Sequence, residues 1–293
     1  MAGKVEAPIR ETDVDAYREF VREAREDPAM IELVRKNFLD SDLRVAAERF
    51  AQSPEYRAAL SKLEPRRGGR ILEIGAGRGI LSFCLAKRGF HVTAIDLNID
   101  PEIGVGARGI YRSFSPVAFQ AVVGDCERLP FRESSFHYVV GRAVLHHASS
   151  LDAMVKEAAR VLKPGGCILT LAEHTIPIYG GRKKFIRRHR ATRYGVRENA
   201  YRYLRYSRAF GKAGFSAFDL FPSMSFREYR QKVRQEWGRH RSLLRRVASQ
   251  LERIPVVGTI LLRCVYHLSR FSEHHFGWPG KPTAFVAEKP GRV

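Results

Sequence analysis

The chain has few cysteines and no long hydrophobic run. These two features argue against a disulfide-rich, zinc-binding or membrane-spanning protein. Four cysteines stand scattered along 293 residues without a Cys-x-x-Cys pair: Cys84, Cys126, Cys167 and Cys264. That spacing argues against a zinc site and a disulfide framework, and it is typical of a reducing cytosol. Residues 1–15 are polar, which predicts no secretory signal. The apolar run 254–262 is far shorter than the roughly 20 residues of a membrane-spanning helix.

Acidic residues are also scarce. The chain has 31 Asp and Glu residues against 51 Lys and Arg residues, a formal net charge of +20. Between Arg182 and Arg253 we count 21 basic and 5 acidic residues, a net of +16, so most of the excess lies late in the chain. A basic face has sequence-independent affinity for phosphates, and a nucleic-acid partner therefore stays open.

Glycine, by contrast, is concentrated in one informative place. The stretch ILEIGAGRGI, residues 71–80, carries Gly75, Gly77 and Gly79 between a predicted strand and a helix predicted at 81–87. A phosphate-binding P-loop needs Gly-Lys-Ser/Thr after its glycines, and none is present. The dinucleotide fingerprint needs a small residue where Ile80 stands. The missing Cβ atoms let the backbone approach some other ligand closely.

Strands and helices alternate after this loop. Further strands are predicted at 91–98, at 121–131 with Asp125 at its end, at 135–142 and at 167–173, and a helix at 151–162. The alternation predicts an α/β fold with a doubly wound, mostly parallel sheet, whose ligands bind at the carboxyl ends of the strands. Asp96 ends the second strand about 20 residues past the glycines, where a carboxylate suits a ribose diol.

The later segments contain fewer decisive signals. Residues 198–211 are predicted to be helical, with Tyr201, Leu204 and Phe210 facing inward. Strands are predicted at 216–221 and 283–290. The residues between them repeat apolar positions at helical spacing against an Arg-rich face, which predicts an inserted pair of helices.

At this point the chain resembles the class I S-adenosylmethionine-dependent methyltransferases of the small-molecule type, with a Methyltransf_11-like core. The matching segments are LEIGAGRG, AIDLN, GDCERLPF and VLHHASSLDAMVKEAARVLKPGG, within residues 70–173. The resemblance implies a Rossmann-like, seven-stranded, mostly parallel sheet whose last strand is antiparallel. His137 departs from the family, which usually has Asp there, at a position that is mostly structural.

The resemblance also implies S-adenosylmethionine as cofactor and assigns residues to it. The glycine loop would approach the methionine part, with Glu73 near the amino group and Arg142 lining the same side. Asp96 would hold the ribose hydroxyls, and Asp125 with the Cys126 backbone the adenine edge. The expected cofactor-binding residues are Glu73, Gly75, Ala76, Gly77, Asp96, Leu97, Asp125, Cys126 and Arg142.

On the acceptor side, two pairs of residues follow predicted strands. His146 and His147 follow the fourth strand, and Glu173 and His174 end the fifth. These four are the candidate catalytic residues for acid or base work, with packing or loop closure as the alternative. No metal is expected, because the pair at 274–275 lacks a carboxylate or cysteine at metal-ligand spacing.

The chain is predicted to divide into four parts: a helical segment at 1–65, the cofactor-binding core at 66–222 with acceptor-side helices from about 176, a basic helical insertion at 223–282, and a final strand and tail at 283–293. The insertion would cap the acceptor pocket. Its basic face would either be solvated or rest on an anionic membrane. The expected location is cytoplasmic, with peripheral contact at the inner membrane surface as a hypothesis.

Three functions remain open from the sequence. The first is methyl transfer to an oxygen or nitrogen, in preference to a carbon, of a small or lipid- or glycan-linked acceptor. The second is RNA methylation using the basic face, although the fourth strand runs into Gly-Arg-Ala-Val and lacks the Asp/Asn-Pro-Pro-aromatic motif of amino-methylases. The third is a non-catalytic, cofactor-binding accessory protein. The oligomeric state is not predicted.

Overall fold

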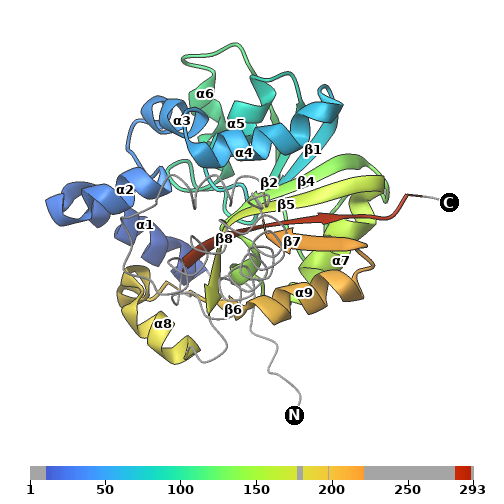
Figure 1. Cartoon of the computed structure of the whole chain (residues 1–293). Helices are drawn as coiled ribbons and strands as arrows, with labels where there is room; N and C mark the ends of the chain where they lie inside the picture. The colour runs from blue at the N-terminus through green and yellow to red at the C-terminus, as the bar shows by residue number, and fades with distance from the viewer. Residues whose placement is uncertain (1–10, 177–180, 197, 221–280, 292–293) are drawn as a thin grey trace, which may run out of the picture.

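The computed structural model describes residues 11–176, 181–196, 198–220 and 281–291. A mixed sheet runs through its centre in the order β3-β2-β1-β4-β5-β8-β7, with the short β6 paired to β5 (Figure 1). The strands are β1 (Arg70–Ile74), β2 (His91–Asp96), β3 (Gln120–Val123), β4 (Phe136–Arg142), β5 (Leu162–Ile176), β6 (Tyr201–Arg202), β7 (Ala217–Leu220) and β8 (Lys281–Glu288).

The directions of the strands confirm the expected fold class. The pairs from β3 through β2, β1 and β4 to β5 are all parallel, whereas β8 is antiparallel to both β5 and β7. This is a Rossmann-like seven-stranded path with an antiparallel last strand. The predicted insertion at 223–282 lies outside the described residues except for its last two, which begin β8.

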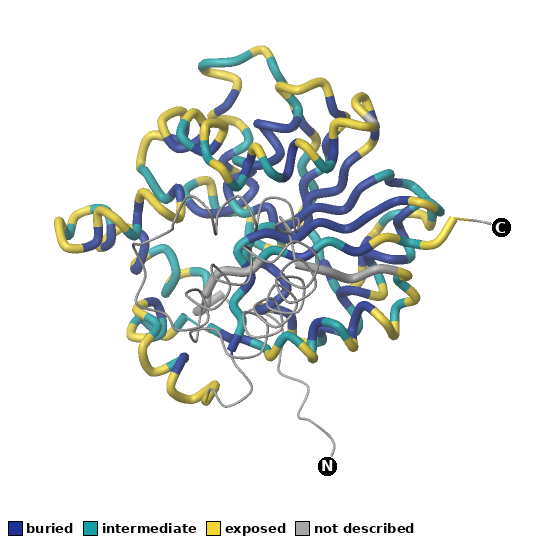
Figure 2. The backbone as a smooth tube through the Cα atoms, in the orientation of Figure 1, coloured by how far each residue is buried: buried dark blue, intermediate teal, exposed yellow. Residues whose placement is uncertain are grey.

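Alternate strand residues enter two different cores because successive side chains point to opposite faces of a sheet. Ile71 of β1 and Tyr138 of β4 belong to one buried cluster, while Leu72 and Val139 belong to the other. The middle residues of the central strands are buried, and half-buried or exposed residues occur toward their ends (Figure 2). Burial on both faces explains why they are continuous apolar runs in sequence.

Helices cover both faces of the sheet (Figure 1). One face packs against α3, α4 and α5, and the other against α7 and α9. The described helices are α1 (Glu11–Glu26), α2 (Ile31–Asn37), α3 (Leu43–Ala51), α4 (Pro54–Leu63), α5 (Ile80–Ala86), α6 (Arg108–Tyr111), α7 (Leu151–Val161), α8 (Arg182–Arg188) and α9 (Tyr203–Lys212).

Side-chain caps define where three of these helices begin. Asp42 accepts hydrogen bonds from the backbone N–H groups at the start of α3, Ser53 does so for α4 and Ser150 for α7. Each cap satisfies a donor that has no partner inside the helix. Within the described ranges, every helix is too short or too polar to cross a bilayer.

A third buried cluster brings distant segments together beyond the carboxyl edge of the parallel strands. Phe20 and Ala24 of α1 pack there with Val34 of α2, Ile103 and Ala191. Figure 1 shows α1, α2 and α8 gathered at this end of the sheet. The N-terminal helices are therefore placed over the edge where ligands bind in such sheets. The domain boundaries predicted at 65, 222 and 282 stay predictions.

Several elements differ from the sequence expectation at their ends. Strand β3 stops at Val123, so Asp125 lies in the following loop. Helix α9 begins at Tyr203, five residues later than predicted. The prediction that Leu204 faces inward is consequently wrong: Leu204 is 45% exposed, whereas Tyr206 is fully buried. The residues before α9 instead form a loop and β6, which pairs with the end of β5.

His137, the position that departs from the family, lies at the amino end of β4. Its Nδ1 accepts a hydrogen bond from the Arg70 backbone N–H over 3.0 Å, and its Nε2 lies 3.2 Å from Lys163 Nζ. It ties the start of β1 to the beginning of β5, at the opposite end of the strands from the site described below.

Candidate active site at the carboxyl edge of the sheet

A large cavity opens at the carboxyl edge, between the strand ends, the N-terminal helices and α8. Its volume is about 2530 Å³. Small-molecule pockets usually measure roughly 300–1,000 Å³. The cavity therefore has room for two ligands side by side.

The glycine loop forms one wall of this cavity. Gly75, Gly77 and Gly79 all have positive φ, at 60°, 48° and 72°. A Cβ on Gly75 would lie 2.3 Å from Val144 Cγ2, whereas one on Gly77 would meet only the carbonyl oxygen of Ile103 at 3.7 Å. Gly75 is thus needed for packing against the turn after β4, while Gly77 and the neighbouring Ala76 present backbone to the cavity.

Glu73 lies in β1 just before this loop and is 2% exposed. The Ser82 hydroxyl of α5 donates a hydrogen bond to its Oε2. Burial raises the pKa of Glu73 to about 8, and the Ser82 hydrogen bond opposes that shift. Its side chain borders the cavity, so it is a buried carboxyl group at a ligand-binding wall.

Asp96 ends β2 and closes the glycine loop from the other side. The Gly77 N–H donates to its Oδ2 and the Asn98 N–H to its Oδ1, each over 2.8 Å. Burial raises the pKa of Asp96, and these backbone donors oppose the shift. Each carboxylate oxygen retains a lone pair for a ligand. Leu97, which is 42% exposed, borders the cavity beside it.

Asp125 and Cys126 lie in the loop after β3, and both border the cavity. The Glu127 N–H donates to Asp125 Oδ1 over 2.7 Å, which fixes the loop locally. The carboxylate of Glu127 accepts from the Ser150 N–H, which ties the loop to the start of α7. Burial raises the pKa of the Cys126 thiol to about 12, so it is a protonated lining group rather than a nucleophile.

Arg142 ends β4 and meets the N-terminal segment. Its Nε donates to Glu55 Oε1 of α4 over 3.1 Å, and its guanidinium carbon lies 5.1 Å from the centre of the Phe38 ring. Both contacts hold the side chain at the cavity wall. The sequence does not predict Glu55 or Phe38 as partners of Arg142, because no local pattern around either residue indicates a contact with β4.

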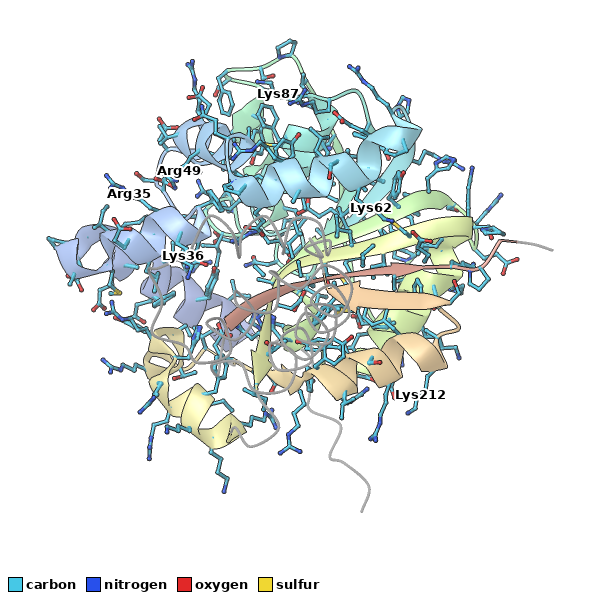
Figure 3. The ribbon with its side chains drawn as sticks, in the orientation of Figure 1. Arg35, Lys36, Arg49, Lys62, Lys87 and Lys212 are labelled. Carbon is cyan, nitrogen blue, oxygen red and sulfur yellow. The ribbon has the colours of Figure 1, made fainter. Side chains whose placement is uncertain are left out.

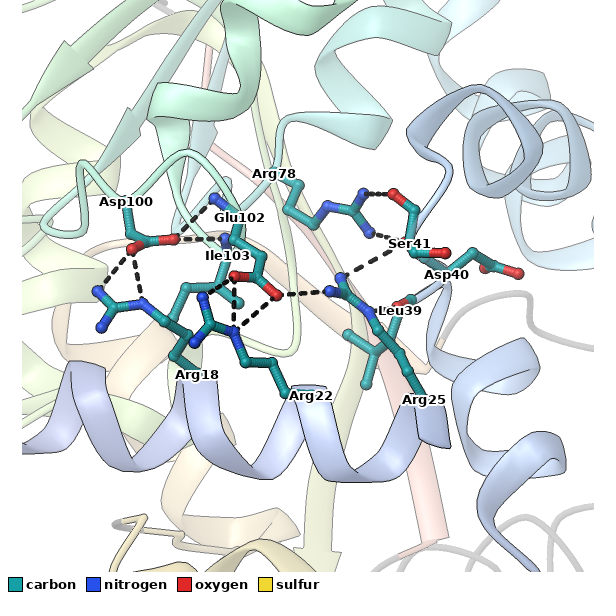
Figure 4. Close-up of polar contacts among 10 residues, drawn as sticks. All are labelled: Arg18, Arg22, Arg25, Leu39, Asp40, Ser41, Arg78, Asp100, Glu102 and Ile103. Atoms are coloured by element: carbon teal, nitrogen blue, oxygen red, sulfur yellow. Dashed lines mark hydrogen bonds and ion pairs between the residues drawn. The ribbon is translucent and has the colours of Figure 1, made fainter. Parts of the chain in front are cut away.

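Helix α1 is clamped to the loop that follows Asp96 (Figure 4). Arg18 donates to Asp100 Oδ2 through two nitrogens, at 2.8 and 2.6 Å. Arg22 and Arg25 both bind the carboxylate of Glu102. The clamp holds the N-terminal helix against the segment expected to bind the ribose.

Glu173 is fully buried near the end of β5 and does not border the cavity. Its carboxylate accepts from the backbone N–H groups of Val144, Leu145 and His146 at 3.1–3.2 Å, and lies 2.7 Å from His146 Nδ1. Burial raises the pKa of Glu173, and the three backbone donors oppose the shift. This geometry favours a positioning role for Glu173, which holds the turn that carries the two histidines.

A second, polar wall of the cavity consists of His146, His147, His174, His189 and Glu198. Glu198 Oε2 lies 4.0 Å from Nε2 of both His146 and His174, and Glu198 Oε1 lies 3.7 Å from His189 Nδ1. The ring of His147 lies 4.2 Å from that of His146. Four segments that are distant in the chain therefore converge on one point.

Burial dominates the protonation of this wall. It lowers the pKa of both His146 and His174 to about 3, and it raises the pKa of Glu198 to about 8. Sequence reasoning missed Glu198 and His189. One signal was available: Glu198 is the only acidic residue between Arg182 and Lys212, in an otherwise basic segment.

Three kinds of similarity bear on this site. Residues 72–170 match the family model described as a methyltransferase domain. The demethylmenaquinone methyltransferase of Tropheryma whipplei (strain Twist) is 35% identical over 118 residues, which are 40% of this chain and 47% of that protein. The demethylmenaquinone methyltransferase of Corynebacterium glutamicum (strain R) is 34% identical over 151 residues, 51% of this chain and 60% of that protein.

The aligned regions span 60% or less of these two relatives, so the likeness concerns the core. Among solved structures, a putative sarcosine dimethylglycine methyltransferase from Galdieria sulphuraria aligns with a TM-score of 0.52 at 14% identity, covering 97% of this chain and all of that one. Phosphoethanolamine N-methyltransferase 2 of Haemonchus contortus, complexed with S-adenosylhomocysteine, aligns with a TM-score of 0.52 at 18% identity, covering 94% of this chain and 60% of that one. At these identities the structures show a shared fold.

Proposed function

We propose, from the premise that residues 72–170 form a class I S-adenosylmethionine-dependent methyltransferase domain, that the whole chain methylates a small-molecule acceptor in the cavity at the carboxyl edge. One observation carries the proposal. A single cavity of about 2530 Å³ is bordered on one side by the glycine loop, Asp96 and Asp125, and on another by the histidines and Glu198. A methyl donor and an acceptor can therefore meet inside it.

The residues expected from the sequence would hold the cofactor. Gly75, Ala76 and Gly77 would lie along its methionine part, with Glu73 facing the amino group and Arg142 lining that side. Asp96 and Leu97 would contact the ribose, and Asp125 and Cys126 the adenine. The contacts that hold these side chains in place come from the protein itself, such as the Gly77 N–H on Asp96. The binding wall is thus organised before the cofactor enters, which limits the entropic cost of binding.

The reaction would be a direct displacement. The acceptor's oxygen or nitrogen attacks the methyl carbon, the carbon–sulfur bond breaks, and S-adenosylhomocysteine and the methylated product result. Alignment of acceptor and methyl group inside a closed cavity supplies several kcal/mol of the barrier reduction. The acceptor's proton would pass to His174, which borders the cavity and whose lowered pKa keeps its imidazole unprotonated, whereas burial keeps Glu198 largely protonated at neutral pH. We propose His146, His147 and His174 as residues that contact the acceptor, and Glu173 as the residue that positions His146.

The similar proteins support a hydrophobic ring or chain in the acceptor. Two of them are named demethylmenaquinone methyltransferases, and a Gibberella zeae relative, 33% identical over 129 residues, is named a sterol 24-C-methyltransferase. Each name describes a lipid-soluble acceptor. The apolar side chains Tyr17, Phe20, Leu33 and Phe185 border the cavity and suit such a molecule. The sterol relative is named for transfer to a carbon, whereas the sequence-based preference is for an oxygen or a nitrogen, and product analysis by mass spectrometry separates the three atoms.

RNA methylation is the alternative that the basic charge motivates. In the described residues, Lys62 of α4 and Lys87 at the end of α5 lie on one side of the sheet, and Lys212 of α9 lies on the other (Figure 3). A nucleic-acid groove needs its cations on one continuous face. These three lysines therefore do not share one face, and the basic residues at 221–280 lie outside the described part of the chain. The membrane hypothesis concerns the insertion, which lies outside the described residues.

Transfer of a labelled methyl group tests the proposal. The full chain is incubated with methyl-labelled S-adenosylmethionine and a cell extract, and the label is followed into lipid, small-molecule and RNA fractions. We expect label in the lipid or small-molecule fraction. Label found only in RNA would favour the alternative, and no transfer despite cofactor binding by calorimetry would favour the non-catalytic accessory protein.

Two variants then test whether the polar wall takes part in catalysis. His174→Gln should lower turnover by about 10²–10⁴-fold if the side chain handles the acceptor's proton, with unchanged affinity for S-adenosylmethionine. His91→Gln, an exposed histidine at the start of β2, is the matched control. Equal turnover in the two variants would leave alignment alone as the source of catalysis.

A further inference from the structure

The carboxyl group of Glu198 is buried, and one of its oxygens lacks a hydrogen-bond partner among the described residues. Its side chain is 7% exposed, and within the described residues its Oε2 has no hydrogen-bond partner. Oε2 nevertheless points between two ring nitrogens, His146 Nε2 and His174 Nε2, at 4.0 Å from each. These separations are too long for hydrogen bonds. A buried carboxylate oxygen without a partner is costly, so the arrangement calls for an occupant.

His146 is oriented as a ligand by its other nitrogen. The Glu173 carboxylate accepts three backbone N–H groups and lies 2.7 Å from His146 Nδ1, whereas the His174 N–H approaches that nitrogen only at 3.4 Å. The shorter contact favours the tautomer in which His146 Nδ1 carries the proton and donates it to Glu173. Nε2 of His146 then carries a lone pair directed at Glu198. A carboxylate behind a histidine in this way fixes its tautomer and raises its basicity, as in carboxylate–histidine–metal arrangements.

We propose that His146, His174 and Glu198 form a binding site for a divalent transition-metal ion. One ligand atom from each residue lies within 4.8 Å of the others. A tetrahedral ion with bonds of about 2.0–2.2 Å holds its ligand atoms roughly 3.4 Å apart. Side-chain rotation would therefore have to shorten the two 4.0 Å separations by about 0.6 Å, and the separation between the two histidine nitrogens, which is at most 4.8 Å, by up to about 1.4 Å. This proposal replaces the sequence-based expectation that no metal is bound.

The donor set indicates which ions fit. Two imidazole nitrogens and one carboxylate oxygen suit zinc or ferrous iron, whereas calcium and magnesium prefer oxygen ligands alone. Three protein ligands also leave positions open toward the cavity that the three residues border. His189, whose Nδ1 has no hydrogen-bond partner within the described residues and lies 3.7 Å from Glu198 Oε1, stands at the edge of the site.

Metal binding itself does not depend on the proposed function, but its role does. If the acceptor is a hydroxyl compound, an ion at this position would bind the hydroxyl oxygen and lower its pKa, which makes the oxygen a better nucleophile. The acceptor class would then be one with a hydroxyl group, such as a phenol, at the end that enters the cavity first.

The test measures zinc binding by the full chain without a purification tag. The protein is treated with a chelator, dialysed and titrated with zinc against a chromophoric chelator, and cobalt is used in parallel for its visible d–d absorption. Glu198→Gln is the main variant, because it keeps the shape and removes the carboxyl group that would ionise to bind the metal. His174→Gln is the second. His91→Gln and Glu133→Gln, both at exposed positions, are the matched controls.

We expect one tight site in the wild type and both controls, and at least a tenfold loss of affinity in Glu198→Gln and His174→Gln. Cobalt should show the absorption of a low-coordinate site only where zinc binds tightly. Equal zinc affinity in Glu198→Gln and the wild type would overturn the proposal and place the metal elsewhere in the chain, and no binding by the wild type would overturn it as well. Calorimetry with S-adenosylmethionine on the same samples reports folding, and the labelled-methyl assay of the wild type reports failure of the proposed function separately from failure of the metal site.

Discussion

Replacing Glu73 by Gln should stabilise the protein at neutral pH, although it removes an acidic residue from the wall that is expected to bind the cofactor. The carboxyl group is 2% exposed and has the Ser82 hydroxyl as its polar partner in the structure. Burial is the largest influence on it and raises its pKa from 4.5 to about 8. Gln has nearly the same shape, can still bind the hydroxyl and never ionises.

The direction of the pH effect follows from proton linkage. Between pH 4.5 and 8 the unfolded chain releases the Glu73 proton, while the folded protein retains it. The free energy of unfolding therefore falls as pH rises through this window and levels off above about pH 8. At about 1.4 kcal/mol per pH unit, Glu73 lowers stability by roughly 3 kcal/mol between pH 5 and 7. The Gln variant lacks this loss, so it should be more stable than the wild type by about 3.5 kcal/mol at pH 7 and by about 0.7 kcal/mol at pH 5.

Urea denaturation of the cofactor-free protein at pH 5, 6, 7 and 8 measures the effect. The quantity of interest is the difference in unfolding free energy between variant and wild type, because the other carboxyl groups cancel in it. Equal denaturant slopes would confirm that the compactness of both states is unchanged. A difference that stays constant from pH 5 to 8 would refute the reasoning, because Glu73 would then titrate alike in the folded and unfolded chains.

Three further predictions concern the cofactor wall and its support. Gly75→Ala should destabilise the protein by about 2–5 kcal/mol in thermal or urea unfolding, because its positive φ adds backbone strain to a 2.3 Å contact with Val144. Gly68→Ala is the control: Gly68 has positive φ, but a Cβ there would have nothing within 4 Å, so only the backbone cost of about 1–2 kcal/mol is expected. Equal losses of stability in the two variants would show that the contact with Val144 contributes nothing. Asp96→Ala should weaken S-adenosylmethionine binding by about 1–3 kcal/mol in calorimetry, and wild-type affinity would remove it from the ribose site. Arg25→Ala removes bonds to Glu102 and the Leu39 carbonyl and should increase proteolysis of α1, whereas Arg44→Ala, which breaks only an exposed i,i+4 pair, should not.

Local chemistry accounts for what sequence reasoning predicted well. The strand positions follow from continuous apolar runs, because parallel strands are buried on both faces. The sequence indicates Gly75 and Gly77 as ligand-contacting residues because glycines at this spacing, between a strand and a helix, let the backbone approach a ligand. It indicates Asp96 because this residue ends the next strand. Parallel strands bring their carboxyl ends to one edge, so these residues had to meet there.

Element ends were predicted less well where neighbours decide them. The apolar pattern of residues 198–211 predicts one continuous helix, in which Leu204 faces inward. The chain instead pairs Tyr201 with the end of β5 and starts α9 at Tyr203. Tyr206 becomes the buried position, and its hydroxyl donates to the His174 carbonyl. Pairing with a distant strand overrode the local helical pattern.

The sequence alone determined the fold class and, through its resemblance to a family, the cofactor and the residues expected to bind it, because each depends on short-range patterns that one segment carries by itself. Only the tertiary structure decided the acceptor side. It buried Glu173 behind His146, brought Glu198 and His189 to His174, and placed Glu55 of α4 against Arg142. These residues come from segments whose separation along the chain bears no relation to their distance in space. No periodicity or spacing could join them, because packing between distant elements is what positions each side chain.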